Sequence, residues 1–595
     1  MKTTESIINI EKSNLDVELI WNDLNLETNE NKTLLKSVSG KIKSGMMIAL
    51  MGSSGAGKTT LMNSLTGRLP SNIKLHGSIL LNGKPRNPKT WNTISSYVSQ
   101  VFYAYEYQTV KETLEFVYNI KLNKKNCNDD INELLSILGL SKVANNYVSK
   151  LSGGERIRLS IGIELIGNPS ILFLDEPFSG LDSFNVIHIL KFLRNLANTG
   201  KAIIITIHQP SYQVLTYFDS IYLMSQGGVI FNGSCNDCIE HFNNLGFILP
   251  QNTNPAEFFL DIISINFQTK ESMETSLLQI NKLKQIWTDK KIQYNSTITT
   301  PIQFNDKKVY NAKLSKIIKI YKRNIQDIIR NKTFILIKIF QRLLTAILFS
   351  IVYWMVGKNK LVSVLSFRGI FTFLCLNSLF GICNPIFNIF KQEQNIILRE
   401  SRSGFYTGYS MYLAKFLSEL TFLSLIEIPY LTIVYILTGF GDTIHKYLLF
   451  ISILMTEIIF GITFGMTISI ISPSANIAQN IGSTIMILFI LFSGSFNQPN
   501  DLSKYLRWLI WFSPVQYTFR SVIQTQSNGK FFSMNSQNTD DTLTNIDSNT
   551  LVQLFGLSNI QFNTCFCIIL IFSLITGSIG SYILHKQTKN TFIKN

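Results

Sequence analysis

The chain has 595 residues, of which 46% are hydrophobic and only 15% are charged, so it is long enough for two or more domains. Soluble proteins usually contain about 25% charged residues, and the deficit here lies in residues 331–595, which consist mostly of apolar runs. The formal net charge of +16 invites a nucleic-acid partner. We expect none, because basic residues gather just before the apolar half, where such a segment is typical of a membrane surface. They are Lys313, Lys316, Lys319, Lys322, Arg323, Arg330 and Lys332.

Neither the N-terminus nor the cysteines indicate secretion. Residues 1–16 are polar and contain no hydrophobic signal region, so we expect the N-terminus to stay in the cytosol. The seven cysteines form no disulfide framework. Cys235 and Cys238 have C-x-x-C spacing without a second pair, which favours ordinary loop cysteines over a metal or redox site.

The first chemical motif follows an apolar run at 47–51 that predicts a buried strand. It reads Gly52-x-x-x-x-Gly57-Lys58-Thr59, and the residues from Thr60 onward predict a helix. Glycines let the backbone N–H groups face phosphate oxygens, while Lys58 reaches the β- and γ-phosphates and Thr59 offers its hydroxyl to Mg²⁺. The predicted nucleotide-binding residues here are Gly52, Ser53, Ser54, Gly55, Ala56, Gly57, Lys58, Thr59 and Thr60.

A second phosphate-binding surface is predicted at Leu151-Ser152-Gly153-Gly154-Glu155. A serine and two glycines that open a helix over 155–166 offer free backbone N–H groups at the positive helix end. One nucleotide needs only one such cradle. We therefore expect Ser152, Gly153 and Gly154 to contact a nucleotide that another copy of the domain holds.

Three predicted strands end in polar side chains. The run 171–174 is followed by Asp175 and Glu176, the run 202–207 by His208, and the strand around 97–99 by Gln100. Ligands bind at the carboxyl ends of parallel strands, so these side chains should face the nucleotide. Asp175 is expected to hold Mg²⁺ directly or indirectly, and Glu176 to act as the base or orienter of the attacking water. His208 is expected to contact the γ-phosphate.

These motifs resemble, in kind and in order, those of ABC-transporter ATPase domains. Two stretches are similar to the G (white-type) subfamily in particular: 152–160, with Arg156 and Arg158, and 206–210, with His208-Gln209-Pro210. The resemblance implies an α/β P-loop ABC ATPase domain that pairs head-to-tail with a second one. Each ATP then lies between the Lys58 loop of one domain and Ser152–Gly154 of the other. The implied catalytic residues are Glu176, His208, Lys58 and Gln100, and the implied Mg²⁺ ligands are Thr59, Gln100 and Asp175. For the aromatic residue that stacks on adenine, Trp21 is the candidate.

The remaining chain predicts a membrane domain. Residues 265–312 are polar with little periodicity, which is typical of a linker. Residues 314–330 predict an amphipathic helix, which the family uses to connect its two domains. Six apolar runs of roughly 20 residues follow, the length that a bilayer demands. We place these spans at 333–356, 367–390, 411–438, 446–471, 476–496 and 561–584. An even number of spans returns the C-terminus to the cytosol, and the basic loop 391–410 then also faces the cytosol.

Residues in the membrane half strengthen the resemblance. Phe387-x-x-Phe390-x-x-Glu393 and Trp511-Phe512-Ser513-Pro514-x-x-Tyr517 are similar to G-subfamily segments. Glu419 and Glu427 fall inside the third span, so they should be paired or face water. The family lines its substrate cavity with the second and fifth spans, which makes Asn377, Phe380, Ile485 and Phe489 the candidate substrate contacts. Where some members close the cavity with a leucine pair, this chain has Ser495 and Phe496.

The predicted organisation is a cytosolic ATP-binding domain (1–263), a polar linker (264–312), a connecting helix (313–331) and an all-α six-helix transmembrane domain (332–595). The resemblance implies a half-transporter that dimerises with itself or with another G-subfamily chain. It would export lipids, sterols or amphipathic molecules, in the plasma membrane or a vesicle membrane. Two alternatives stay open: an ATP-gated regulator or channel that does not pump, and a soluble ATPase that handles nucleic acids.

Overall fold

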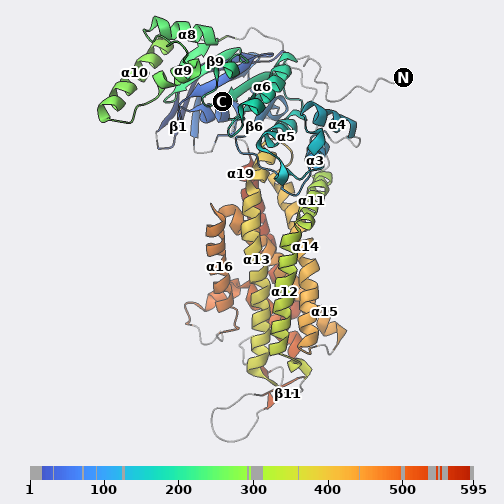
Figure 1. Cartoon of the computed structure of the whole chain (residues 1–595). Coiled ribbons are helices and arrows are strands. Elements are labelled where there is room, and N and C mark those ends of the chain that lie inside the picture. Colours follow the sequence, from blue (N-terminus) through green and yellow to red (C-terminus); the bar gives the residue numbers. More distant parts are fainter. Residues whose placement is uncertain are drawn as a thin grey trace. The chain divides into compact units, whose positions relative to one another are not determined.

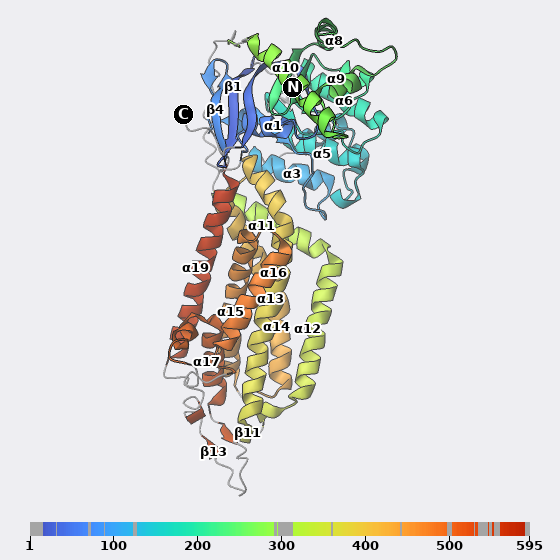
Figure 2. The same cartoon turned by 90° about the vertical axis from the view of Figure 1, so that its left-hand side faces the viewer.

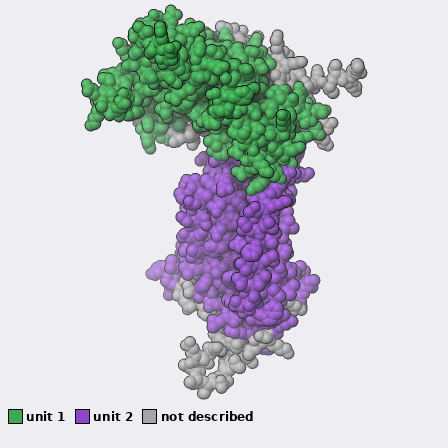
Figure 3. All heavy atoms as spheres, viewed as in Figure 1, with its two compact units in different colours: residues 1–311, 399–405, 589–595 green, residues 312–398, 406–588 purple. Residues whose placement is uncertain are grey.

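A computed structural model describes 16–30, 32–69, 73–88, 90–122, 128–290, 294–295, 313–358, 361–440, 443–496, 503–528, 530–533, 545–546, 550–551 and 560–589. The chain divides into two compact units, coloured separately in Figure 3. The first unit contains residues 1–311 together with 399–405 and 589–595. The second contains residues 312–398 and 406–588. Each is described by itself below.

The first unit contains a six-stranded sheet in the order β10-β9-β3-β8-β7-β6. All of its neighbouring strands run parallel except β9 and β10, which form a hairpin. The strands are β3 (Met47–Gly52), β6 (Ser95–Val98), β7 (Ile171–Leu174), β8 (Ala202–Thr206), β9 (Ser220–Ser225) and β10 (Gly228–Gly233). The run at β7 and the first four residues of β8 are apolar because both faces of a parallel sheet are covered. The sequence therefore predicted these two strands correctly.

A four-stranded antiparallel sheet, in the order β2-β1-β4-β5, completes the unit (Figure 1). Its strands are β1 (Glu18–Thr28), β2 (Thr33–Lys43), β4 (Ile73–Leu81) and β5 (Lys84–Pro85). Trp21 lies in β1 and is only 2% exposed, with its ring 5.9 Å from that of Tyr222. The interpretation of Trp21 as the adenine-stacking residue was wrong, because its ring is enclosed in the core between the sheets.

The helices of the first unit surround the sheets (Figure 1). They are α1 (Lys58–Thr66), α2 (Trp91–Ile94), α3 (Val110–Lys121), α4 (Asn128–Ile137), α5 (Gly153–Leu165), α6 (Ser183–Asn198), α7 (Tyr212–Leu215), α8 (Cys235–Asn244), α9 (Pro255–Ile263) and α10 (Lys270–Asp289). Thr109 and Glu112 form a capping box at the start of α3. Cys235 lies in the first turn of α8 and Cys238 is buried.

The region expected as a polar linker, 264–312, contains helix α10. Its buried side chains Ile280 and Leu283 belong to the same hydrophobic core as the parallel sheet. Only two apolar positions of a mostly polar helix are fully buried, so composition alone favoured a linker. Residues 296–312 lie outside the described part of the chain.

The second unit is helical, and its long helices run alongside one another in both views (Figures 1 and 2). The helices of this unit are α11 (Lys313–Arg330), α12 (Lys332–Val352), α13 (Val364–Arg402), α14 (Gly408–Leu437), α15 (Ile444–Ile471), α16 (Ala475–Leu491), α17 (Pro514–Ser527) and α19 (Phe562–Thr588). A small sheet joins β11 (Leu361–Ser363), β12 (Phe531–Ser533) and β13 (Asn545–Ile546).

Within the described residues, five helices are long and apolar enough to cross a membrane: α12, α13, α14, α15 and α19. The fifth expected span corresponds to α16, an apolar helix of 17 residues. Helix α13 continues to Arg402, well beyond the span expected at 367–390. The stretch between the fifth and sixth expected spans, 497–560, contains α17, which is almost wholly buried.

The carboxylates of α14 are paired, as the sequence predicted. Arg342 of α12 contacts Glu427 through its Nε at 2.8 Å and Nη2 at 2.6 Å. Lys415, one turn before Glu419 on the same helix, lies 3.0 Å from that carboxylate. Both pairs are buried, so each charge is compensated inside an apolar bundle.

Candidate nucleotide-binding and hydrolysis site

The P-loop connects the buried strand β3 to helix α1. Gly52 ends β3, and a Cβ at this position would lie 2.2 Å from the carbonyl oxygen of Met224, so only glycine fits. Gly57 has a φ of 98° and caps α1, which places the free N–H groups of the first helical turn at the loop. This cradle of backbone donors is the geometry that phosphate groups require.

Lys58 lies across the loop that it follows. Its side chain is 6% exposed, and its Nζ donates to the carbonyl oxygens of Gly52 at 2.8 Å and Ser53 at 3.1 Å. Burial lowers the pKa of Lys58, and the charges of Glu176 and Asp175 partly offset this effect. A poorly solvated ammonium group beside the cradle fits an anionic ligand such as the phosphates of a nucleotide.

Asp175 stands at the carboxyl end of β7 with three hydroxyl groups around it. Its Oδ1 accepts a hydrogen bond from Thr206 at 2.7 Å, and its Oδ2 accepts one from Tyr97 at 2.9 Å. The hydroxyl of Thr59 lies 3.5 Å from Oδ1. A hydroxyl and a carboxylate this close are oxygen ligands of the kind that Mg²⁺ prefers, so the donor set fits that ion.

The carboxylate of Glu176 contacts two of the other predicted catalytic side chains. Gln100 donates from its Nε2 to Oε2 of Glu176 at 2.7 Å, and Nε2 of His208 lies 3.2 Å from Oε1. The backbone of Glu176 has a φ of 46°, and its N–H donates to the hydroxyl of Thr206 at 2.6 Å. Strained backbone of this kind is characteristic of functional sites, where the surrounding structure maintains it. The structure therefore brings Glu176, Gln100 and His208 together at one edge of the sheet.

The second predicted phosphate-binding surface lies at the N-terminus of α5. Ser152 is the N-cap and forms a capping box with Glu155, whose carboxylate accepts from both the N–H and the hydroxyl of Ser152 at 2.9 Å. Gly153 and Gly154 occupy the first two helical positions. In the described part of the chain, no hydrogen bond or ion pair joins Ser152, Gly153 or Gly154 to the P-loop.

Sequence reasoning missed two site residues, Tyr97 and Thr206. Both contact Asp175, and Thr206 also contacts Glu176. Each lies in a strand that the sequence did predict, near the edge where Asp175 lies. Position at a strand's carboxyl end was therefore the available signal for both residues.

The four candidate substrate contacts lie in the second unit. Asn377 is already engaged, because its Oδ1 accepts from Arg342 at 3.0 Å and its Nδ2 donates to Tyr430 at 2.7 Å. Phe380 of α13 and Ile485 and Phe489 of α16 are partly buried and pack against the helical core. The ring of Phe489 lies 5.7 Å from that of Phe464. Contact of these four residues with a substrate remains a prediction.

Comparisons with known proteins agree with this arrangement. The family model described as "ABC transporter" matches residues 35–179, and two described as "ABC-2 type transporter" match residues 315–527 and 208–343. The "ABC transporter ATP-binding protein/permease wht-1" of Caenorhabditis elegans is 30% identical over 84% of this chain and 78% of its own length. The chain belongs to the ABC transporters.

Two further relatives support this assignment. "ABC transporter G family member 7" of Arabidopsis thaliana is 29% identical over 86% of this chain and 73% of its own length. "Protein white" of Drosophila melanogaster is 28% identical over 83% of this chain and 74% of its own length. The name of the first of these relatives places the chain with the G subfamily. The chain is a multi-pass membrane protein with an ABC ATP-binding domain, and its ATPase activity is coupled to transport.

Proposed function

We propose that this G-subfamily chain is a half-transporter that works as a dimer. The observation that carries the proposal is the separation of two phosphate-binding surfaces within one ATPase unit. The P-loop cradle around Lys58 and the α5 N-terminus at Ser152–Gly154 share no hydrogen bond or ion pair among the described residues. A second chain, either identical or another G-subfamily half-transporter, would complete each nucleotide site.

In each site, the chain's own residues have distinct proposed roles. Lys58 and residues 52–60 bind the ATP phosphates, while Thr59 and Asp175, with Gln100, would hold Mg²⁺, which neutralises phosphate charge when bound. Glu176 orients the attacking water or accepts its proton, and His208 contacts the γ-phosphate. Closure of the two ATPase domains around the nucleotides then changes the conformation of the membrane helices.

The proposed cargo is a lipid, a sterol or an amphipathic organic molecule that is exported from the cytosolic side. The support is the family membership and the apolar composition of the helices. We place the protein in the plasma membrane or a vesicle membrane, with both termini in the cytosol. The basic loop and tail residues Lys391, Arg402, Lys586 and Lys589 favour that orientation.

The test is ATPase activity in vesicles that contain the purified chain, measured with and without candidate lipids. A half-transporter of this kind shows stimulation by its substrate, and Glu176→Gln removes it. Substrate-independent ATPase activity without vesicle accumulation of any tested compound would contradict transport, and would favour the ATP-gated regulator.

A further inference from the structure

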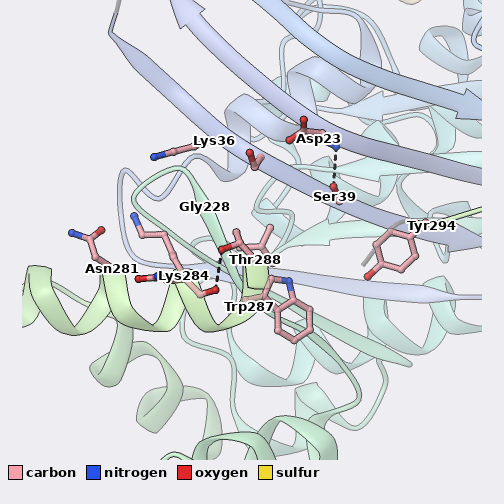
Figure 4. A pocket seen from close by; sticks show the side chains of 12 residues that line it. Asp23, Lys36, Ser39, Gly228, Asn281, Lys284, Trp287, Thr288 and Tyr294 are labelled. Atoms are coloured by element: carbon pink, nitrogen blue, oxygen red, sulfur yellow. Dashed lines mark hydrogen bonds between the residues drawn. The ribbon is translucent and has the colours of Figure 1, made fainter. Parts of the chain in front are cut away.

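A second cavity in the first unit lies outside the nucleotide site. It has a volume of about 780 Å³ and lies between the antiparallel sheet and helix α10 (Figure 4). Lys36 and Ser39 of β2 contribute to one wall, and Asn281, Lys284 and Thr288 of α10 contribute to the other. None of its lining residues belongs to the P-loop or to the group around Glu176. Cavities of this size hold small organic ligands.

Two ammonium groups without an acidic partner face this cavity. Neither Lys36 nor Lys284 forms an ion pair with any described residue, and the nearest recorded contact of Lys284 Nζ is the carbonyl oxygen of Gln226 at 3.4 Å. Burial and the nearby charge of Lys36 lower the pKa of Lys284. Two like charges that line one cavity repel each other, and a bound anion would relieve that repulsion.

One amide lies on the same side of the cavity as the two lysines, and two hydroxyl groups also line the cavity. Asn281 lies one turn before Lys284 on the same face of α10, and Figure 4 shows its amide on the same side of the cavity as both lysines. Ser39 and Thr288 line the cavity with hydroxyl groups, and that of Thr288 donates to the carbonyl oxygen of Gln285 at 2.9 Å. Asp23 is the one acidic side chain among the described lining residues, and its N–H donates to Ser39 at 2.8 Å. This set of cations, amide and hydroxyls matches the phosphate group of an organic ligand.

The cavity is also connected to the P-loop through one turn. The N–H of Lys36 donates to the carbonyl oxygen of Gly227 at 2.8 Å, and the N–H of Gly227 donates to that of Ala56 at 3.1 Å. Lys284 contacts the neighbouring Gln226. The turn packs closely against β2, because a Cβ on Gly227 would lie 2.5 Å from the carbonyl oxygen of Leu34. A ligand held by the two lysines would therefore act on the backbone that supports the nucleotide cradle.

We propose that the cavity between β2 and α10 is a regulatory site that binds a phosphate-bearing small molecule through Lys36 and Lys284 and alters nucleotide affinity through Gly227. This site is distinct from the one that hydrolyses ATP. It depends neither on the direction of transport nor on the identity of the transported substrate. Reciprocity requires that nucleotide binding change the affinity of this site by the same factor.

Binding is tested on the full-length chain in detergent with pyrophosphate as the probe. A non-hydrolysable ATP analogue saturates the nucleotide site. Any pyrophosphate binding that calorimetry still detects therefore occurs at another site. The variant Lys36→Gln/Lys284→Gln is expected to raise Kd by about tenfold or more, because charge-assisted hydrogen bonds to both ammonium groups are lost. The control Lys32→Gln/Lys74→Gln makes the same change in net charge at exposed positions outside the cavity, and should bind as the unmodified chain does.

Thermal unfolding and binding of the ATP analogue establish that both variants are folded. Equal pyrophosphate affinity in the cavity variant and the control would overturn the proposal, and so would the absence of binding to the unmodified chain. In a second measurement, pyrophosphate should shift the affinity for the ATP analogue by about fivefold or more. The same measurement is repeated on Lys58→Ala, in which direct competition between pyrophosphate and the ATP analogue at the P-loop is weakened. Binding without any such shift would refute the connection through Gly227.

The source of the phosphate group is distinguished in vesicles. ATPase activity is compared in phosphatidylcholine vesicles alone, with added soluble glycerol phosphate, and with an added lipid whose headgroup carries a phosphomonoester. A response to the soluble compound indicates a metabolite site, and a response to the lipid alone indicates a headgroup site. In either case the response must disappear in Lys36→Gln/Lys284→Gln and persist in the control, and a response that both variants retain would contradict the site.

Discussion

The hydroxyl of Tyr97 donates a hydrogen bond to Oδ2 of Asp175 at 2.9 Å, while Thr206 holds the other carboxylate oxygen at 2.7 Å. These two bonds fix the plane of the carboxylate that is proposed to face Mg²⁺. The ring of Tyr97 is held in turn by the guanidinium of Arg68, 4.6 Å from its centroid. Both hydroxyls thus orient the carboxylate of Asp175.

Removing the Tyr97 hydroxyl should lower the apparent affinity for Mg²⁺ more than it lowers the stability of the fold. Loss of one hydrogen bond to a charged group costs about 1.5–3 kcal/mol. Tyr97→Phe should therefore require a roughly tenfold higher Mg²⁺ concentration for half-maximal ATPase activity. The measurement is ATPase rate against Mg²⁺ concentration at saturating ATP. Tyr217→Phe, at a partly buried tyrosine away from Asp175, serves as the control, and an equal response of both variants would exclude a positioning role for Tyr97.

Glu176→Gln should separate hydrolysis from binding. The amide can still hydrogen-bond Gln100 and His208 but cannot accept a proton, so ATPase activity should fall by about 10²–10⁴-fold. ATP affinity should change little, because Lys58 and the P-loop remain. A binding assay with radiolabelled ATP, run beside the ATPase assay, checks both halves. Retention of more than a tenth of the activity would argue that another group takes the proton.

Lys201 makes stability depend on pH in the alkaline range. Its Nζ donates to Asn168 Oδ1 at 2.7 Å and to the carbonyl oxygen of Pro169 at 2.9 Å, and burial lowers its pKa to about 8. The unfolded chain, with an ordinary lysine pKa of about 10.4, therefore binds more protons than the folded chain between these values. Stability conferred at this position must rise with pH in that window.

The corresponding measurement is Tm at a series of pH values for the unmodified chain and for Lys201→Gln. Between about pH 7.5 and about pH 9.5, the free energy of unfolding derived from these Tm values should rise by roughly 1–2 kcal/mol more for the unmodified chain than for Lys201→Gln. A difference that does not vary with pH would show that Lys201 does not titrate in this range.

Replacing one partner of the buried pair Arg342 and Glu427 should lower the stability of the protein far more than replacing both. Arg342 also donates to Asn377, so Glu427→Leu alone leaves a charged guanidinium in the helical bundle. Such a change costs about 3–5 kcal/mol, whereas an apolar replacement of both partners is often close to neutral. Thermal unfolding in detergent should show Glu427→Leu as much less stable than Arg342→Met/Glu427→Leu. Additive effects of the two substitutions would contradict the pairing.

The central strands and the grouping of the proposed catalytic residues could be predicted because their signals are local. Four consecutive apolar residues at 171–174 followed by two acids specify both a buried strand and a ligand at its end. The same holds for 202–207 and His208. The P-loop is specified by glycine spacing, and its placement between β3 and α1 confirms that prediction.

Features that depend on tertiary packing could not be predicted in this way. The antiparallel sheet has polar positions and register shifts, for example between Trp21 and Leu24, which break the simple alternation of a strand. Trp21 was misassigned because only the folded core shows that its ring is enclosed. Helix α10 was missed because its burial depends on Ile280 and Leu283 alone. The bonds from Tyr97 and Thr206 to Asp175 join residues far apart in the chain.

The mass of the purified complex in detergent, measured together with its ATPase rate, tests the account most directly. With saturating ATP and the Glu176→Gln variant, the nucleotide should hold two chains together, so the complex should have twice the mass of a single chain, or the mass of this chain plus a related partner. The unmodified chain should lose ATPase activity when it is diluted to a monomer. A strict monomer that hydrolyses ATP at the full rate would contradict the proposal that the α5 N-terminus of one chain completes the P-loop site of another.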